Sequence, residues 1–234
     1  IEDNKPDAVA LMEEKVAPYE NIRVVAAKTQ YPEGAEKMLI KKVMGRQVPS
    51  GKLPADVGCV VSNTSTAKAI SDAIQKGMPL VERAVSVTGD FIRNPGNYMV
   101  KLGTNVQELI DHCGGITGDD VVLKMGGPMM GAPLKDTNVP IIKGSNGVIA
   151  IAADHTEEKE CIKCGRCVDV CPMELQPLEI YKYGQLGDAE KLLTLNVMDC
   201  FSCKCCEYIC SSKIPLVSKI NAAKGLVMPL LKKK

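Results

Sequence analysis

Hydrophobic positions in the first 80 residues follow two different patterns. Apolar side chains recur at helical spacing over residues 6–16, 34–44 and 65–76, which is typical of helices that bury one face. Residues 22–26 and 57–61 are short apolar runs rich in β-branched side chains, which is typical of buried strands. Strands that alternate with helices predict a parallel sheet with both faces covered, so we expect part of an α/β domain here.

The ends of these predicted helices carry recognisable residues. Ser65 or Thr66 is expected to cap the third helix, because a hydroxyl side chain accepts hydrogen bonds from the free N–H groups of a first turn. Gly45 and Gly77 are expected to stop the second and third helices, because glycine readily adopts the left-handed conformation that ends a helix.

The pattern changes between residues 81 and 140. Two alternating stretches flank the turn signal Asn-Pro-Gly-Asn at residues 94–97, which predicts strand, turn and strand. A helix is expected at residues 106–113, followed by a further strand at residues 120–127. Two strands, a helix and more strand within so short a stretch predict a β-grasp arrangement.

The chain contains 11 cysteines, and most of them fall into two runs with one spacing. The first run is Cys161-x2-Cys164-x2-Cys167-x3-Cys171, followed by Pro172. The second run, 28 residues further on, is Cys200-x2-Cys203-x2-Cys206-x3-Cys210, followed by serines at 211 and 212. This is the spacing of bacterial two-cluster ferredoxins, in which the fourth cysteine of each run binds the other cluster. Helix-like stretches at residues 177–183 and 188–195 lie in the linker.

We therefore predict two [4Fe–4S] clusters with crossed ligation. The first has Cys161, Cys164, Cys167 and Cys210 as ligands, and the second has Cys171, Cys200, Cys203 and Cys206. Cys205 lies between two ligands in the wrong register and is expected to be a spare thiol. Cys59 and Cys113 lie in apolar surroundings and are expected to be small buried hydrophobes.

Other interpretations of the cysteines remain open at this point. A pair of zinc sites also uses Cys-x2-Cys pairs, although the regular third and fourth cysteines fit a cubane better. Disulfides are a second alternative, but no secretory signal begins the chain, and dense cysteine is more often a metal site in an intracellular protein. No acid–base or nucleophilic group of residues stands out, so we predict no catalytic side chain.

Net charge, the length of apolar stretches and the lack of a glycine-rich phosphate loop each argue against one class of protein. The 234 residues carry a formal net charge of +1, which argues against a nucleic-acid partner. No apolar stretch reaches the ~20 residues of a membrane-spanning helix. No glycine-rich phosphate loop occurs, since the paired glycines of residues 124–131 are not followed by a helical pattern.

The order of several segments resembles one protein family. The segments are AAKTQYPEGAEKMLIKKVMGRQVP, GKLPADVGCVVSNTSTAKAI, GMPLVERAVSVTGDFIRNPGNYMVKLGT, KMGGPMMGAPL and IKGSNGVIAI, followed by the two cysteine runs. Together they resemble the C subunit of the Rnf electron transport complex, a ferredoxin:NAD oxidoreductase. That family is similar to the NADH-binding subunit of respiratory complex I.

The resemblance implies an architecture of α/β plus α+β class in three parts. Residues 1–80 would be the C-terminal part of a flavin- and NADH-binding α/β domain, with a partial parallel sheet. Residues 81–150 would be a soluble-ligand-binding β-grasp (SLBB) domain with connecting strands, and residues 151–234 an α-helical two-cluster ferredoxin module. The family's glycine-rich loop would precede Ile1, so we expect the chain to be truncated at its N-terminus.

The resemblance also implies a function. Electrons would pass between NADH and a ferredoxin-type carrier through FMN and the two [4Fe–4S] clusters, in a membrane-bound complex whose other subunits pump ions. The chain would lie as a peripheral protein on the cytoplasmic side of the bacterial membrane. FMN and NADH would bind the full-length protein only, and we expect the chain by itself to be soluble and inactive with NADH.

Two loops resemble the flavin pocket of that family. The resemblance implies that Ser62, Asn63 and Thr66 lie near the flavin, with Tyr31 and Glu33 on the facing loop.

Two other functions remain open. One is a cobalamin-reducing flavoprotein of propanediol utilisation, which oxidation of the reduced protein by a corrinoid would reveal. The other is a non-catalytic electron-wire or docking fragment, which NADH-dependent reduction by the full-length protein would exclude.

Overall fold

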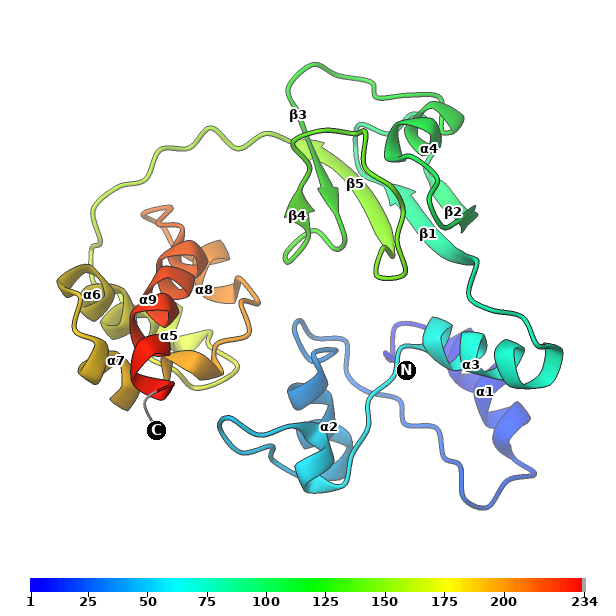
Figure 1. Cartoon of the computed structure of the whole chain (residues 1–234), viewed down its shortest axis with the longest axis horizontal. Helices are drawn as coiled ribbons and strands as arrows, with labels where there is room; N and C mark the ends of the chain where they lie inside the picture. The colour runs from blue at the N-terminus through cyan, green and yellow to red at the C-terminus, as the bar shows by residue number, and fades with distance from the viewer. Residues whose placement is uncertain (233–234) are drawn as a thin grey trace. The chain divides into compact units, whose positions relative to one another are not determined.

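A computed structural model of the chain describes residues 1–232 (Figure 1). Its Cα positions form two compact units, and neither is continuous in sequence. The first comprises Ile1–Val61 and Val168–Phe201 with the chain's end from Ala223, and the second comprises Ser62–Cys167 and Ser202–Ala222. Lys233 and Lys234, which close the predicted ferredoxin module, lie outside the described residues.

The N-terminal part of the first unit contains the first two of the three helices predicted for residues 1–80. They are α1 (Pro6–Val16) and α2 (Glu36–Met44), followed by the short 3-10 helix η1 (Pro54–Val57). Gly45 ends α2 in the left-handed conformation with φ of 65°, as predicted.

The two strands predicted for the first 80 residues are wrong. Among the described residues of this stretch, the backbone forms one isolated parallel bridge, between Glu2 and Ala27. Residues 57–61 instead complete η1 and continue without a ladder. An apolar β-branched run becomes a strand only where a neighbouring strand accepts its hydrogen bonds, and these runs have no such neighbour in this structure. The partial parallel sheet is therefore not formed.

The later part of the first unit is helical, and here the predictions are confirmed. It contains α6 (Pro177–Leu186), α7 (Ala189–Thr194) and the 3-10 helix η2 (Val197–Asp199). The carboxylate of Asp188 caps α7 by accepting from the backbone N–H of Lys191 at 2.9 Å. Ile180, Leu192 and Val197 are fully buried. The last helix, α9 (Leu216–Leu231), begins in the second unit and ends in the first.

The second unit begins with α3 (Thr64–Lys76). Its cap is Asn63, whose side-chain oxygen accepts from the N–H of Ser65 at 2.9 Å. The predicted caps, Ser65 and Thr66, are therefore wrong by two or three positions and lie inside the helix. Gly77 ends α3 in the left-handed conformation, as predicted.

The remainder of the second unit is built around a five-stranded mixed sheet. Its elements are β1 (Glu82–Thr88), β2 (Gly96–Lys101), α4 (Val106–His112), β3 (Val121–Met125), β4 (Ala132–Pro133) and β5 (Gly147–Ala152). The strand order is β2-β1-β5-β3-β4, in which β1 and β5 are parallel and all other neighbours are antiparallel. The hairpin, the helix and the following strand all form where the sequence predicts them.

Alternation along the strands places one face of the sheet in a core. In β1, Val85 and Val87 are buried and their neighbours are exposed. They belong to a cluster of buried residues that also contains Val106 and Ile110 of α4, so α4 covers this face of the sheet. Gly89 follows β1 with φ of 112°, and a Cβ there would lie 2.0 Å from the carbonyl oxygen of Ala150. Only glycine allows this close approach of two backbone segments.

Ile141 and Ile142 provide a matched test of this core. Ile141 is 0% exposed and belongs to the core, whereas Ile142 is 60% exposed. We expect Ile141→Ala to lower the free energy of unfolding by about 3 kcal/mol, because it removes buried methylenes and leaves a cavity. Ile142→Ala should change it by less than about 0.5 kcal/mol. Urea unfolding followed by circular dichroism measures both, and equal effects would contradict the assigned core.

Candidate iron–sulfur site

The two cysteine runs share one local backbone conformation. Each position of the second run lies 39 residues after its counterpart in the first. Lys163 and its counterpart Ser202 have left-handed φ angles of 56° and 61°. Gly165 and its counterpart Lys204 have left-handed φ angles of 79° and 67°. The two runs are therefore alike in backbone conformation at these positions as well as in cysteine spacing.

The repeat continues beyond the third cysteine. The short helices α5 (Arg166–Asp169) and α8 (Cys205–Tyr208) occupy equivalent positions. After the fourth cysteine of each run, Glu174 and its counterpart Lys213 again adopt left-handed φ angles, of 55° and 53°. Two copies of one loop–helix–turn unit thus present their cysteines in the same local geometry.

This backbone conformation suits an anionic metal cluster. A non-glycine residue in the left-handed region costs about 1 kcal/mol, so such residues persist only where surrounding structure holds them. All six of the positive-φ non-glycine residues described lie between residues 163 and 213. Successive residues of opposite helical hand turn their N–H groups into a concave anion-binding surface. Thiolate donors together with such a surface fit a [4Fe–4S] cluster.

The four predicted ligands of the first cluster belong to the second unit. Cys161, Cys167 and Cys210 are half-buried and Cys164 is exposed. Burial raises the pKa of the Cys167 thiol, and the charges of the other three thiols raise it further.

Hydrogen bonds hold the beginning of one run beside the end of the other. The hydroxyl of Ser212 donates to the carbonyl oxygen of Glu160 at 2.9 Å. The N–H of Lys159 donates to the carbonyl oxygen of Ser212 at 2.8 Å. Ser212 is 5% exposed and lies two positions after Cys210, whereas Glu160 immediately precedes Cys161. These contacts bring the fourth cysteine of the second run to the first cysteine of the first run.

Ser212 is a buried structural residue that the sequence argument missed. It stands near the position at which the first run has a proline, and the sequence marked this only as a departure from the pattern. Its buried side chain and its bonds to Glu160 and Lys159 show what the serine does. Proline has no hydroxyl and no backbone N–H, so it could not make the contact to Glu160.

The remaining cysteines have different surroundings. Of the ligands predicted for the second cluster, Cys203 and Cys206 are buried, and Cys171 and Cys200 are half-buried. Cys205 begins α8 and is buried. The four predicted ligands occupy places equivalent to those of the first cluster's ligands, whereas the counterpart of Cys205 is Arg166.

The two isolated cysteines differ from each other. Cys113 is 0% exposed and packs in the sheet core, so the prediction of a small buried hydrophobe is confirmed. Cys59 is only half-buried, and its Sγ donates to the carbonyl oxygen of Val57 at 3.6 Å. Arg46 Nη1 also lies 3.9 Å from this sulfur. The prediction of an apolar buried environment for Cys59 is therefore wrong, because the strand that would have enclosed it does not form.

A site for a single metal ion would need a different arrangement of side chains. Within residues 1–232, no three His, Cys, Asp or Glu side chains are grouped closely enough to hold one metal ion. The cysteines of a cubane bind different iron atoms, and their sulfurs are further apart than the ligands of a single ion.

The five candidate flavin residues are divided between the two units. Glu33 forms an ion pair with Lys42 at 3.2 Å, and its Oε2 is one of two buried side-chain polar atoms without a hydrogen-bond partner among the described residues. Tyr31 is half-exposed beside it in the first unit. In the second unit, Asn63 is used as the cap of α3, and Ser62 and Thr66 are exposed.

The repeated cysteine loops define a two-cluster iron–sulfur protein of the ferredoxin type. Three family models match consecutive parts of the chain: "Nuo51 FMN-binding domain" at residues 1–72, "SLBB domain" at residues 84–133 and "4Fe-4S dicluster domain" at residues 160–214. The dicluster match covers both cysteine runs, and the order of the three matches is the order expected from the sequence.

Curated relatives give the particular family. The chain is 45% identical over 188 residues to the C subunit of the proton-translocating ferredoxin:NAD(+) oxidoreductase complex of Clostridium ljungdahlii, covering 79% of this chain and 41% of the relative. It is 40% identical over 227 residues to the C subunit of the Na(+)-translocating ferredoxin:NAD(+) oxidoreductase complex of Acetobacterium woodii, covering 96% and 51%. It is 43% identical over 230 residues to the C subunit of the ion-translocating oxidoreductase complex of Rhodobacter capsulatus, covering 96% and 44%.

The chain belongs to this family of C subunits, the Rnf family. It spans about half, or less, of the length of the curated relatives it matches. Within residues 1–232, no helix combines the length and hydrophobicity needed to cross a membrane.

Proposed function

We propose that this chain carries electrons between a flavin and a ferredoxin-type carrier, as part of an ion-translocating ferredoxin:NAD oxidoreductase complex. The observation that carries the proposal is the 39-residue repeat, in which two cysteine runs share spacing, left-handed residues and following helices. The match of residues 160–214 to a 4Fe–4S dicluster domain supports the same function independently of the geometry.

The thiolates of the two runs would hold two [4Fe–4S] clusters with crossed ligation. Cys161, Cys164, Cys167 and Cys210 would hold the first, and Cys171, Cys200, Cys203 and Cys206 the second. Each cluster, when bound, accepts and releases one electron at a time. The bonds between Ser212 and the chain at residues 159 and 160 support the crossing, because they keep the two runs together.

The protein would set the conditions in which each cluster works. Backbone N–H groups of the loops would donate to the cluster sulfurs, and such hydrogen bonds raise the reduction potential. Lys204 pairs with Glu207 at 3.9 Å within the second run, so its charge is partly balanced. Glu207 also accepts from the N–H of Val217 at 3.0 Å and so joins the loop to the start of α9.

Flavin and NADH would be bound by the longer protein rather than by these residues alone. The match of residues 1–72 to an FMN-binding domain supports a contribution of this chain to the flavin site. Ser62, Asn63, Thr66, Tyr31 and Glu33 are our candidates. The unpartnered Oε2 of Glu33 supports a missing donor near that loop.

The mixed sheet supports a β-grasp fold for the middle domain. Its order β2-β1-β5-β3-β4, with the parallel pair at the centre and α4 on one face, is the arrangement expected of that fold. We propose the domain boundaries 1–80, 81–150 and 151–234, which are similar to the limits of the three family matches.

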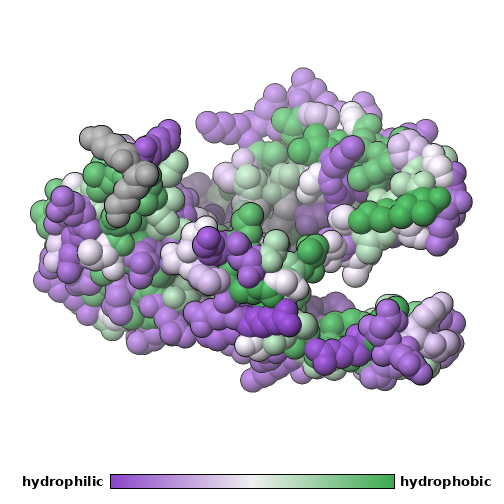
Figure 2. All heavy atoms as spheres, turned by 60° about the horizontal axis from the view of Figure 1, so that its bottom comes forward, coloured by the Kyte–Doolittle hydropathy of each residue, from purple (hydrophilic) through white to green (hydrophobic). Residues whose placement is uncertain are grey.

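Other subunits of the complex are the proposed partners, at the cytoplasmic face of the membrane. Hydrophobic side chains reach the surface in patches, which Figure 2 shows in green. On α3, which buries no residue, Ile70 is 52% and Ile74 is 78% exposed. Apolar side chains grouped on one exposed helix are typical of surfaces that contact other proteins.

Metal content tests the proposal. Protein purified without oxygen should contain about eight iron atoms and about eight acid-labile sulfides per chain, because two cubanes require them. Iron and sulfide assays on the anaerobic protein measure this, and a sample exposed to air serves as the control for cluster loss. Stoichiometric zinc with little sulfide in the anaerobic protein would contradict the proposal.

A further inference from the structure

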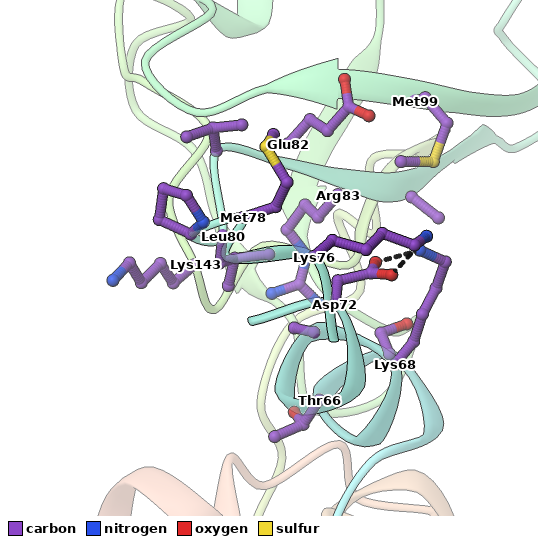
Figure 3. Close-up of a pocket in the computed structure, with 15 residues that line it drawn as sticks. Thr66, Lys68, Asp72, Lys76, Met78, Leu80, Glu82, Arg83, Met99 and Lys143 are labelled. Atoms are coloured by element: carbon purple, nitrogen blue, oxygen red, sulfur yellow. Dashed lines mark hydrogen bonds and ion pairs between the residues drawn. The ribbon is translucent and has the colours of Figure 1, made fainter. Parts of the chain in front are cut away.

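A cavity of about 360 Å³ lies in the second unit, between α3 and the strands β1 and β2 (Figure 3). Its volume is within the range of sites for small organic molecules. One wall is α3, from Ser65 to Lys76, with the segment that follows it, and the other is the exposed face of the hairpin, including Glu82, Ala84 and Met99. Neither the cysteine loops nor the predicted cluster ligands contribute to it.

Arg83, which lines this cavity, has a buried donor atom without a hydrogen-bond partner among the described residues. Its Nε is the second of the two buried side-chain polar atoms without a hydrogen-bond partner among the described residues. A buried donor left unsatisfied costs free energy, so native proteins almost always pair it. Arg83 lines the cavity, and a guanidinium can donate two parallel hydrogen bonds to a carboxylate or phosphate.

The charged groups around the cavity favour an anion. Four basic side chains line it, against the carboxylates of Asp72 and Glu82: they are those of Lys68, Lys76, Arg83 and Lys143. Asp72 is held between two of the lysines, forming an ion pair with Lys68 and a second with Lys76 at 2.8 Å (dashed in Figure 3). Hydrogen bonds from Lys68 and then Lys76 lower the pKa of Asp72 to about 2. These contacts leave Arg83 and Lys143 without a carboxylate of α3.

The rest of the lining is aliphatic. Met78, Leu80, Val81 and Met99 contribute apolar surface, and Met78 and Met99 are 51% and 61% exposed. Methionine is flexible and polarisable, so it adapts to apolar groups of different shape. A ligand that combines an anionic head with an apolar body would therefore contact both kinds of lining at once.

We propose that this cavity is a binding site for a small organic anion, with its carboxylate or phosphate on Arg83 and its apolar part against Met78 and Met99. Of the candidate flavin residues, Thr66 touches its edge, whereas Ser62 and Asn63 do not line it.

Four probe compounds test the anionic head and the apolar part of the proposed ligand, separately and together. Isothermal titration calorimetry of the full chain would use hexyl phosphate, hexanoate, inorganic phosphate and hexanol. We expect one or both of the amphiphilic anions to bind at least about tenfold more tightly than inorganic phosphate and hexanol, since only they satisfy Arg83 and cover apolar surface together. The tighter of the two anions identifies the head group. Absence of binding of both at millimolar concentration, or equal binding of inorganic phosphate or hexanol, would overturn the proposal.

Variants locate the site. Arg83→Gln should weaken binding of the preferred anion at least about tenfold, as expected for loss of a paired charged donor. Lys101→Gln removes a charge from the same hairpin outside the cavity and should leave affinity unchanged. Asp72→Asn should strengthen binding, because it releases Lys68 and Lys76 from their carboxylate. Circular dichroism checks that each variant folds, and Lys143→Gln replaces Arg83→Gln if that variant does not. Unchanged affinity in the variant that is used, or weaker binding in Asp72→Asn, contradicts the assignment.

Discussion

Cys210→Ser is expected to abolish the iron–sulfur cluster whose other ligands lie in the first cysteine run, and to leave the second cluster in place. The reason is geometric. Ser212 donates to the carbonyl oxygen of Glu160 and accepts from the N–H of Lys159, so the end of the second run, with Cys210, lies beside the start of the first. Serine is a far weaker ligand for iron than a thiolate, so the iron content should fall by about half, since each cubane holds half of the metal. Electron paramagnetic resonance of the reduced protein should show loss of one of two signals.

Two neighbouring cysteines provide the controls for this variant. Cys206→Ser should remove the other signal, because Cys206 is assigned to the second cluster. Cys205→Ser, one position away, should leave both signals, because its register is wrong for a ligand. If Cys210→Ser and Cys206→Ser removed the same signal, each run would bind its own cluster and the crossed assignment would be wrong.

Removal of both clusters should unfold the cysteine loops while the mixed sheet stays folded. The loops contain helices of only four residues and left-handed residues that the surrounding contacts must hold. Metal binding supplies much of the folding free energy of such small modules. The sheet has a core of its own, with twelve buried residues from its strands, α4 and the connecting loops.

Hydrogen exchange measured by mass spectrometry tests this prediction. After oxidative removal of iron under a chelator, the amides of residues 161–215 should lose protection, and those of β1 and β5 should retain it. The cluster-containing protein kept without oxygen is the control. Simultaneous loss of protection in both regions would show that the chain unfolds as one cooperative unit, and unchanged protection in the loops would show that they fold without metal.

Local features of the fold could be predicted from the sequence because they depend on residues close together in the chain. The spacing of apolar residues gave α1 its two ends, and Gly45 and Gly77 ended α2 and α3 where expected. The turn signal at residues 94–97 predicted the β1–β2 hairpin, although Gly96 and Asn97 already belong to β2 and pair with β1. The exception was the cap of α3, for which Ser65 or Thr66 was predicted, whereas Asn63 has the extended φ and ψ of a cap.

Strand formation could be predicted only where the partner strand was also present nearby. Residues 22–26 and 57–61 have the composition of buried strands, but composition does not supply the neighbouring backbone that completes a ladder. Because residues 57–61 form no strand, Cys59 lies half-buried beside Arg46 instead of inside a sheet.

The sequence by itself determined the chemistry of the candidate cluster site, because cysteine spacing fixes which thiols one tight loop can present. Only the tertiary structure decided how the two loops are joined: Ser212 and Glu160 are 52 residues apart, and no periodic pattern relates them. The insertion of β5 between β1 and β3, and the meeting of α3 with the hairpin around Arg83, were decided in the same way. Contacts between distant segments depend on which surfaces are left to bury once local structure has formed, and this is a property of the folded chain as a whole.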